Sequence, residues 1–380
     1  MQSKIYRPCG IFRSGKIEYG KCVEIKENRL TTLIDEKEIS PDFSVIDLPD
    51  VILSPGFIDT QINGGGGILA NTANNSDEIA EILQAQKKFG TAVIFPTFIT
   101  DQASKLEKFI SLIADCQKNN IRGIFGAHFE GPFINPQKRG THRQEFVRRI
   151  NNDDWTLLEK HRNTLEKSIF TIAPEFFSNT EIRRLSSISP LINAGHTLAT
   201  AEDIVRGKEN GLRGITHLMN AMPAFSAREP SIFATAAALD LFAGIISDGI
   251  HSSVYSLFAA GKVYDARRLM LVTDAMSPLG ADISEFDLLG IKVKVAGKKL
   301  VNAEGNLAGA NTPLIECAQI ARNAMRFSNE EVLQMLVSTP SEYLQMPELA
   351  EIINRPIDEI VAVNKADFSL VTNFLAHSLK

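Results

Sequence analysis

The chain has 380 residues, a formal net charge of −5 and no block of basic residues, which argues against a nucleic acid or an anionic membrane surface as its main partner. The length suits one large domain with a smaller one, and no apolar run is long enough for a signal peptide or a membrane span. Four cysteines without metal-binding spacing are typical of a reducing compartment, so we expect a cytoplasmic protein.

The two chain ends are both predicted to be β-rich. Short strands with polar turns are expected at 15–19, 21–25 and 29–34, and two more within 359–372. Because both ends flank a middle of different character, they are expected to meet in one small β-sandwich domain. We assign residues 1–52 and 352–380 to it.

The middle of the chain, residues 53–351, alternates short apolar runs with longer amphipathic segments. Repeated β-then-α units require a parallel sheet, and eight of them fit a closed (β/α)₈ TIM-type barrel in an α/β fold. The predicted strands are 51–58, 92–98, 123–129, 169–174, 191–194, 214–216, 242–247 and 269–273. The predicted helices include 76–89, 103–119, 179–185, 200–210 and 252–260, with a hairpin-like stretch at 286–307 and further helices over 312–344.

Polar residues stand at or just after the end of almost every predicted strand. In a barrel the C-terminal strand ends share one mouth, so residues far apart in the sequence are expected to converge there. These residues are Asp59, Thr60, Gln61, Thr97, His128, Glu130, Glu175, His196, His217, Asp248 and Asp274.

Three of these residues form a candidate metal site. Glu130, His196 and His217 supply one carboxylate and two imidazoles, a recurrent catalytic zinc arrangement that leaves a position open. We expect one divalent ion per subunit, with Zn²⁺ best suited to this ligand set and Fe²⁺, Mn²⁺ or Co²⁺ able to occupy it. His128 shares a strand face with Glu130 and is expected to be a core or supporting residue rather than a ligand.

Asp274 follows the last predicted strand, in the run LMLVTDAM. A carboxylate at that place is costly to bury without a partner. It could be a structural aspartate bonded to backbone amides. The functional alternative, which we favour, is a general base that takes a proton from water and passes it to a leaving amine.

Eight motifs occur in an order that resembles the N-acetylglucosamine-6-phosphate deacetylases of the amidohydrolase superfamily. The resemblance covers residues from about 50 to 345. PGFID is shared by many amidohydrolases, whereas HxxNAM followed by REP and DGxH is specific to the deacetylases. The motifs are PGFIDTQING (55–64), HFEGPFINPQKRGTH (128–142), GHT (195–197), THLMNAM (216–222), REP (228–230), SDGIH (247–251), VTDAM (272–276) and NLAG (306–309).

The resemblance implies hydrolysis of the acetamide of a sugar phosphate, with Asp274 and His142 as catalytic residues and His142 close to the reacting carbonyl. It also implies that Arg228 reaches the phosphate in a neighbouring subunit, and hence a homodimer. The substrate-binding residues that it implies are Thr141, His142, Asn220, Ala221, Arg228, His251, Leu307, Ala308 and Gly309.

The first strand departs from the wider superfamily in its polar residues. Many amidohydrolases carry an HxH pair there, which builds a second metal site, whereas this chain has Gln61 and Asn63. Amides are weak zinc ligands compared with imidazole, so we expect one tightly held metal.

Two alternatives remain open at this point. Another single-metal amidohydrolase, such as a cyclic-amide hydrolase or a deaminase, would share the metal ligands and Asp274 but would not need Arg228. A sugar-phosphate binder without catalytic activity would be expected to have lost a metal ligand or Asp274, and all of these are intact.

Overall fold

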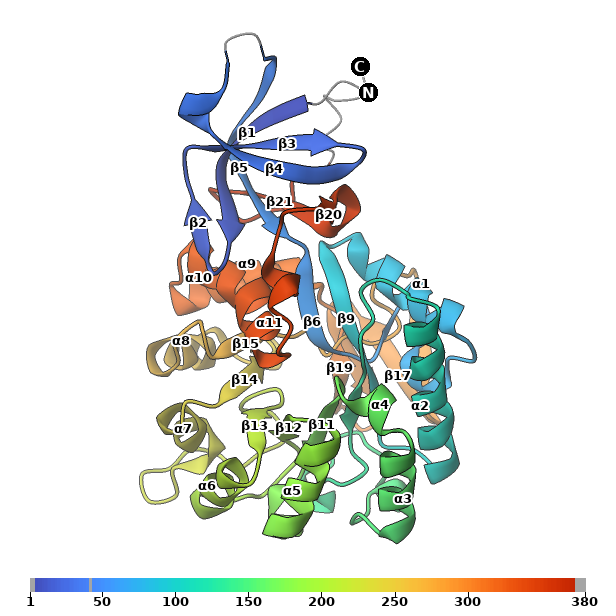
Figure 1. The fold of residues 1–380 in the computed structure, drawn as a ribbon. Helices are drawn as coiled ribbons and strands as arrows, with labels where there is room; N and C mark the ends of the chain where they lie inside the picture. The colour runs from blue at the N-terminus through green and yellow to red at the C-terminus, as the bar shows by residue number, and fades with distance from the viewer. Residues whose placement is uncertain (1–3, 41–42, 373–380) are drawn as a thin grey trace.

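The computed structural model describes residues 4–40 and 43–372, so the last part of the predicted small domain, residues 373–380, lies outside the described residues. A small sheet stands above a larger barrel (Figure 1). The sheet order and the helices around the barrel confirm the predicted architecture, a (β/α)₈ barrel with a small β part built from both chain ends.

The small sheet has the order β20-β4-β3-β1-β5-β21, with β2 paired to β1. β5 runs parallel to β1, and the C-terminal β21 pairs antiparallel with residues 51–55 of β5, so the two ends of the chain share this sheet. Its strands are β1 (Lys4–Arg13), β2 (Lys16–Glu18), β3 (Lys21–Lys26), β4 (Arg29–Asp35), β5 (Val45–Pro55), β20 (Arg355–Pro356) and β21 (Ile360–Asn364).

Two strand predictions differ from the structure at the ends of the chain. The stretch expected as one strand over 51–58 is divided, because β5 ends at Pro55 and the first barrel strand begins at Phe57. The second C-terminal strand, expected near 368–372, is reduced to a single bridge between Val363 and Leu370.

The barrel strands follow one another in chain order around the sheet, and all neighbouring pairs are parallel. The third strand is shorter than the predicted 123–129, with only a bridge from Ile124 to Ile94 before it begins. The strands are β6 (Phe57–Ile62), β9 (Thr91–Ile99), β10 (His128–Glu130), β11 (Ile169–Ile172), β12 (Leu191–Ala194), β13 (Leu212–Ile215), β14 (Phe242–Ile245) and β15 (Leu269–Leu271).

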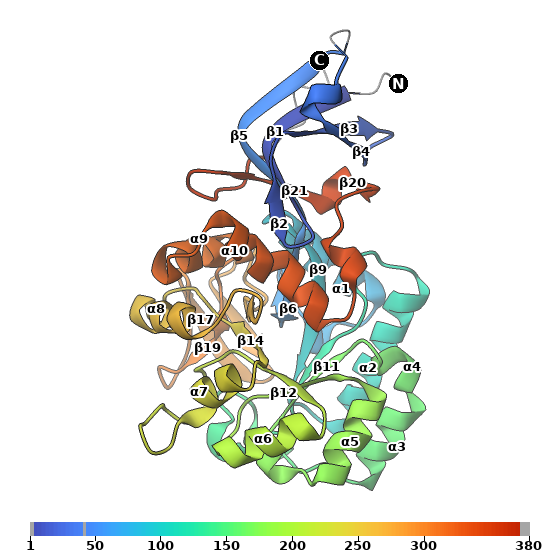
Figure 2. The ribbon, with the colours of Figure 1, turned by 60° about the vertical axis from the view of Figure 1, so that its left-hand side comes forward.

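Helices lie around the outside of the strands (Figure 2). The sequence prediction missed α3, although Asn151 and Asp154 form a capping box at its start, and it missed α7, whose sequence SIFATAAA has little amphipathic pattern. The helices are α1 (Ser76–Lys87), α2 (Ala103–Lys118), α3 (Asn152–Lys160), α4 (Arg162–Leu165), α5 (Asn179–Ile188), α6 (Ala201–Glu209), α7 (Ser231–Ala238), α8 (Val254–Val263), α9 (Leu314–Met325), α10 (Asn329–Leu333) and α11 (Thr339–Tyr343), with a π-helical stretch η6 (Gln334–Ser338) between the last two.

A separate four-stranded antiparallel sheet follows the last barrel strand, where the hairpin-like stretch was predicted. Its last strand is tied to the barrel, because Ala310 N–H donates to Asp274 O at 3.0 Å and Met276 N–H donates to Ala310 O at 3.0 Å. This places Leu307 and Gly309 beside the strand end that carries Asp274. The strands are β16 (Glu285–Leu288), β17 (Ile291–Ala296), β18 (Lys299–Asn302) and β19 (Leu307–Ala310).

Candidate active site

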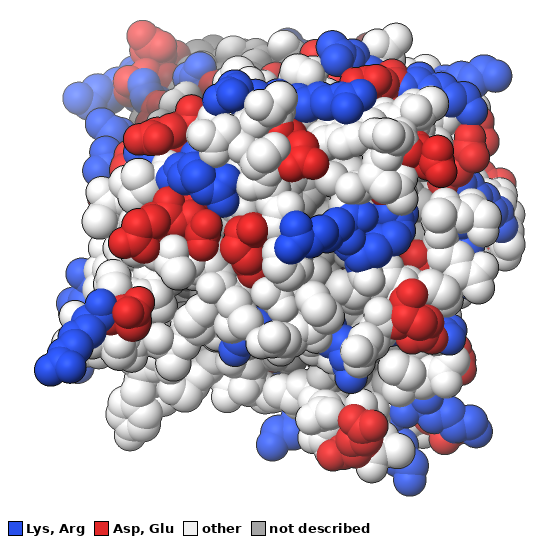
Figure 3. Space-filling view, turned by 90° about the horizontal axis from the view of Figure 1, so that it is seen from below, with Lys and Arg blue, Asp and Glu red and all other residues white. Residues whose placement is uncertain are grey.

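A cavity of about 210 Å³ lies at the C-terminal ends of the barrel strands. The barrel face opposite the small sheet carries interspersed positive and negative side chains rather than one basic field (Figure 3). Most of the predicted site residues line this cavity, namely Glu130, Thr141, His142, His196, His217, Asn220, Ala221, His251, Asp274, Leu307 and Gly309.

Glu130, His196 and His217 bring their ligand atoms to one point. Glu130 Oε1 lies 2.9 Å from His217 Nε2 and 3.2 Å from His196 Nε2, and the two Nε2 atoms are 3.0 Å apart. His196 Nδ1 lies 2.8 Å from the carbonyl of Lys138, to which its N–H can donate, so its Nε2 presents a lone pair. Two buried imidazole nitrogens and a carboxylate oxygen that converge in this way fit a single divalent cation.

A second grouping of possible ligands overlaps the first. Glu130, His142 and His196 can each offer one ligand atom within 4.8 Å of the others. His142 Nε2 is 3.8 Å from Glu130 Oε2, farther than His217 Nε2 is from Oε1. We therefore keep His217 in the candidate ligand set and place His142 beside it.

The carboxylate of Glu130 stays ionised in this cluster. Burial alone would raise its pKa, but the adjacent imidazoles of His196 and His217 outweigh that effect and hold the pKa well below its ordinary value. An ionised carboxylate at the centre of the cluster is the form that binds a cation.

Two amides at the end of the first barrel strand contact the candidate ligand Glu130 and the candidate base Asp274. Asn63 Nδ2 donates to Asp274 Oδ1 at 2.6 Å, and Gln61 Nε2 donates to Glu130 Oε1 at 2.9 Å and to Asp274 Oδ1 at 3.3 Å. Burial, and then the charge of Glu130, raise the pKa of Asp274 to about 6. Gln61 therefore donates to both carboxylates, whereas Asn63 donates to Asp274 alone.

Several site residues adopt a left-handed backbone although they are not glycine. His196, His217, Ala221 and Asp274 have φ values of 47°, 31°, 51° and 53°. Such conformations cost free energy and persist only where surrounding contacts enforce them. Asn135 N–H, for example, donates to His196 O at 2.8 Å. Strain gathered at the strand ends is typical of a functional site.

His251 is held by the carboxylate of Asp248, which follows β14. Asp248 Oδ2 lies 2.7 Å from His251 Nδ1, and Asp248 Oδ1 accepts from the backbone N–H groups of Ile250 and His251. Burial opposes ionisation of Asp248, but these hydrogen bonds hold its pKa below the ordinary value. The other ring nitrogen of His251, Nε2, takes no part in this contact. Because His251 lines the cavity, Nε2 can bind a ligand there.

Two predicted substrate residues do not line the cavity. Ala308 is buried in an apolar cluster, while its neighbours on β19 face the cavity. Arg228 is exposed in the segment between β13 and α7, and it makes no hydrogen bond or ion pair with another described residue. One chain thus does not bring Arg228 to its own cavity, and its predicted role in a neighbouring subunit stays a prediction.

The sequence prediction missed Thr100 and misjudged Thr97. Thr97 Oγ1 accepts from Ile62 N–H at 2.9 Å within the barrel wall, whereas Thr100, just past the strand end, contacts His142 Nδ1. His128 uses both ring nitrogens, toward Thr60 O at 3.0 Å and Thr171 Oγ1 at 2.7 Å, so it is not a candidate ligand.

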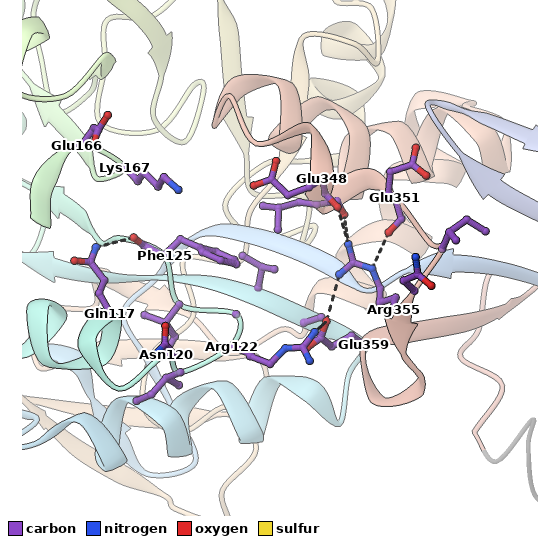
Figure 4. A pocket seen from close by; sticks show the side chains of 18 of the residues that line it. Gln117, Asn120, Arg122, Phe125, Glu166, Lys167, Glu348, Glu351, Arg355 and Glu359 are labelled. Atoms are coloured by element: carbon purple, nitrogen blue, oxygen red, sulfur yellow. Dashed lines mark hydrogen bonds and ion pairs between the residues drawn. The ribbon is translucent and has the colours of Figure 1, made fainter. Parts of the chain in front are cut away.

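A larger cavity, of about 620 Å³, lies at the other end of the barrel (Figure 4). Within it Arg122 Nε and Nη2 donate to Glu359 Oε1 and Oε2, each at 3.0 Å, and Arg355 Nη1 donates to Glu359 Oε2 at 3.5 Å. Its walls join the barrel to the C-terminal segment, and no group of three possible metal ligands was found there among the described residues. Because no such group of ligands was found there, the larger volume of this cavity is not evidence that the reaction takes place in it.

None of the helices within residues 4–40 and 43–372 combines the length and the hydropathy that a membrane-crossing segment needs.

The chain is similar to named proteins along most of its length. It is 36% identical over 301 residues to N-acetylgalactosamine-6-phosphate deacetylase of Shewanella sp. (strain ANA-3), with 79% of this chain and 76% of that protein covered. It is 32% identical over 308 residues to N-acetylglucosamine-6-phosphate deacetylase of Bos taurus, with 77% and 74% covered. The crystal structure of N-acetylglucosamine-6-phosphate deacetylase from Pasteurella multocida matches with a TM-score of 0.88 at 27% identity and 97% coverage of both chains. No protein-family model matches the chain.

Proposed function

The chain belongs to the N-acetylglucosamine-6-phosphate deacetylase family, and we propose that it hydrolyses the acetamide of N-acetyl-D-glucosamine 6-phosphate to D-glucosamine 6-phosphate and acetate. The observation that carries the proposal is the convergence of Glu130, His196 and His217 beside Asp274 in one buried cavity. This is the constellation that amide hydrolysis needs.

The candidate ligands Glu130, His196 and His217 would hold one divalent ion, which we propose to be Zn²⁺. Such an ion, when bound, supplies Lewis acidity toward the amide carbonyl. His142 contributes a neutral imidazole, because burial, and then the neighbouring imidazole of His196, lower its pKa to about 3. A neutral imidazole that donates from Nε2 can stabilise negative charge on the carbonyl oxygen.

Asp274 is the proposed general base and general acid. It takes a proton from the attacking water, the hydroxyl adds to the acetyl carbon, and the C–N bond breaks as the proton passes to the leaving amine. Asn63 and Gln61 orient its carboxylate from one side. The products are therefore acetate and the free amine.

The phosphate of the substrate requires donors at the rim of the cavity. His251, oriented by Asp248, and the backbone at Asn220 and Ala221 are the proposed groups within the chain. Arg228 of a second copy would complete the phosphate site in a homodimer. We further propose that the enzyme works in the cytoplasm, where a phosphorylated sugar is retained.

N-Acetylgalactosamine 6-phosphate is a second candidate substrate. The Shewanella relative named for that sugar is 36% identical to this chain, whereas the Bos taurus relative named for the glucosamine compound is 32% identical. The two sugars differ only in the configuration at C4, away from the reacting acetamide. Measuring kcat/KM for both epimers decides between them.

The test is a deacetylation assay with protein purified without chelator, paired with elemental analysis. Release of equal amounts of acetate and amine from the sugar phosphate, with one metal per chain, is the expected result. Turnover of a cyclic amide but not of the sugar phosphate would favour another amidohydrolase. Binding of the sugar phosphate without turnover would favour a non-catalytic binder.

A further inference from the structure

Thr100 contacts His142 on the side away from the metal cluster. His142 Nδ1 lies 2.8 Å from Thr100 Oγ1, and the backbone N–H of Thr100 donates to the same Nδ1 at 3.4 Å. Both residues are buried. The opposite ring nitrogen, Nε2, lies 3.8 Å from Glu130 Oε2 and faces the reaction cavity.

The backbone contact decides which nitrogen of His142 carries hydrogen. A backbone N–H can only donate, so Nδ1 must present its lone pair, and the neutral ring must then carry its hydrogen on Nε2. The other tautomer would bring two N–H groups face to face in a buried site, which leaves both donors unsatisfied. The hydroxyl of Thr100 lies closer, at 2.8 Å, and can donate to Nδ1 in place of its longer contact with the carbonyl of Glu130 at 3.5 Å.

A glycine beside Thr100 leaves the space that its hydroxyl occupies. A Cβ at Gly131 would lie 2.1 Å from Thr100 Oγ1, so only glycine at position 131 leaves room for the hydroxyl. Gly131 directly follows the candidate ligand Glu130, and the strand end that carries the metal site is thereby packed against Thr100.

We infer that Thr100 is a positioning residue that fixes His142 as the Nε2–H tautomer, so that His142 donates to the reacting carbonyl and does not ligate the metal. This inference deepens the proposed function and rests on it for the identity of the carbonyl. It also decides between the two overlapping ligand groupings. A nitrogen that carries hydrogen has no lone pair for a cation, so the grouping that includes His142 is excluded.

The test compares Thr100→Val, which removes the hydroxyl at nearly constant shape, with Thr100→Ser, which keeps it. Thr100→Val is expected to lower kcat on the order of 10-fold, with unchanged metal content and little change in KM, because one hydrogen bond to a buried group is lost. Thr100→Ser is expected to restore most of the turnover. Equal kcat values for Thr100→Val and the wild-type enzyme would overturn the positioning role of the Thr100 hydroxyl, because the backbone N–H of Thr100 is unchanged in this variant.

A direct readout is the ¹⁵N spectrum of histidine-labelled, zinc-loaded wild-type protein, in which the His142 signals are identified by their loss in His142→Gln. The expected result is an unprotonated Nδ1 and a protonated Nε2. A protonated Nδ1 would overturn the inference, even if Thr100→Val does not fold. A protein that shows the expected tautomer but releases no acetate would refute the proposed function and leave the tautomer assignment intact.

Discussion

Thr273 Oγ1 donates a 2.5 Å hydrogen bond to Asp59 Oδ2, and this contact joins the two ends of the barrel sheet. Asp59 lies on β6 and Thr273 follows β15. Among the described residues, the only β-bridge across this seam is the isolated one between Ile62 and Ala275. Asp59 also accepts from the backbone N–H groups of Gln61 and Thr273, so one buried carboxyl holds both sides of the seam.

The seam predicts a pH-dependent stability. Burial raises the pKa of Asp59 from 3.8 to about 7, although hydrogen bonds from Thr273 and Gln61 oppose the shift. Between these values the folded chain keeps a proton that the unfolded chain loses, so the free energy of unfolding falls as the pH rises from about 4 to about 7. The side chain in Asp59→Asn does not titrate. This decrease in the free energy of unfolding, on the order of a few kcal/mol, should therefore be absent in the variant.

Urea unfolding of chelator-treated protein at several pH values across this window measures the effect. The free energy of unfolding of Asp59→Asn should improve relative to the wild-type protein as the pH rises. Parallel pH profiles for the two proteins would show that Asp59 does not titrate in this window.

The ends of the barrel strands could be predicted from the sequence because an apolar run that meets an ionisable residue marks the point where a buried strand reaches the mouth of the barrel. Glu130, His196, His217 and Asp274 are such cases, and all four line one cavity. The position of Thr100 could not be predicted, because β9 continues to Ile99 and Thr97 offered an earlier polar residue. Neither could the division of the stretch 51–58 between two sheets, since both halves are equally apolar.

Contacts between distant segments account for the other differences. Ala308 and Gly309 are neighbours on β19, but only the glycine faces the cavity, and a Cβ there would lie 2.5 Å from Met276 Cε. The hydrogen bonds from Gln61 and Asn63 to Asp274 could not be predicted either, because the partners are 213 and 211 residues apart along the chain. A single sequence does not provide such pairings.

The ligand assignment predicts different consequences for His217 and His142. His217→Ala removes a lone pair at the point where the three ligand atoms meet, so most of the bound metal should be lost. His142→Gln should keep one metal per chain and lose turnover, because its Nε2–H is a donor rather than a ligand. Elemental analysis after gel filtration checks both variants, and metal loss in His142→Gln with retention in His217→Ala would reverse the assignment.

Asp274→Asn tests the proposed base. The substitution keeps the size of the side chain and removes its ability to accept a proton, so turnover should fall about 10²- to 10⁴-fold while metal and substrate still bind. Initial rates of acetate release, together with elemental analysis and substrate titration, check this. Near-normal turnover would exclude Asp274 as the base.

The ion cluster at the opposite end of the barrel predicts an effect on stability without an effect on chemistry. Glu359 is buried between Arg122 and Arg355, so Glu359→Gln leaves the half-buried Arg355 without its carboxylate (Figure 4). We expect a loss on the order of 3 kcal/mol in the free energy of unfolding and unchanged kcat. Asp358→Asn is the matched control, because its pair with Lys87 is exposed and should contribute about 1 kcal/mol or less. Equal effects of the two substitutions on unfolding would contradict the assignment.

Arg228→Ala tests whether the phosphate site is shared between two copies. The arginine is exposed and does not line the cavity of its own chain, so its loss should raise KM for the phosphorylated substrate about 10- to 100-fold through the missing charge-assisted contact. KM for the sugar without phosphate should not change.

Mixing Arg228→Ala with Asp274→Asn under subunit exchange makes the same test without reference to KM. In a mixed dimer, the subunit that keeps Asp274 receives Arg228 from its partner, so one complete site forms and activity at low substrate concentration should rise above that of either variant alone. If Arg228 served its own chain, each site in the mixed dimer would lack one residue. The mixture would then show no more than the average activity of the two variants.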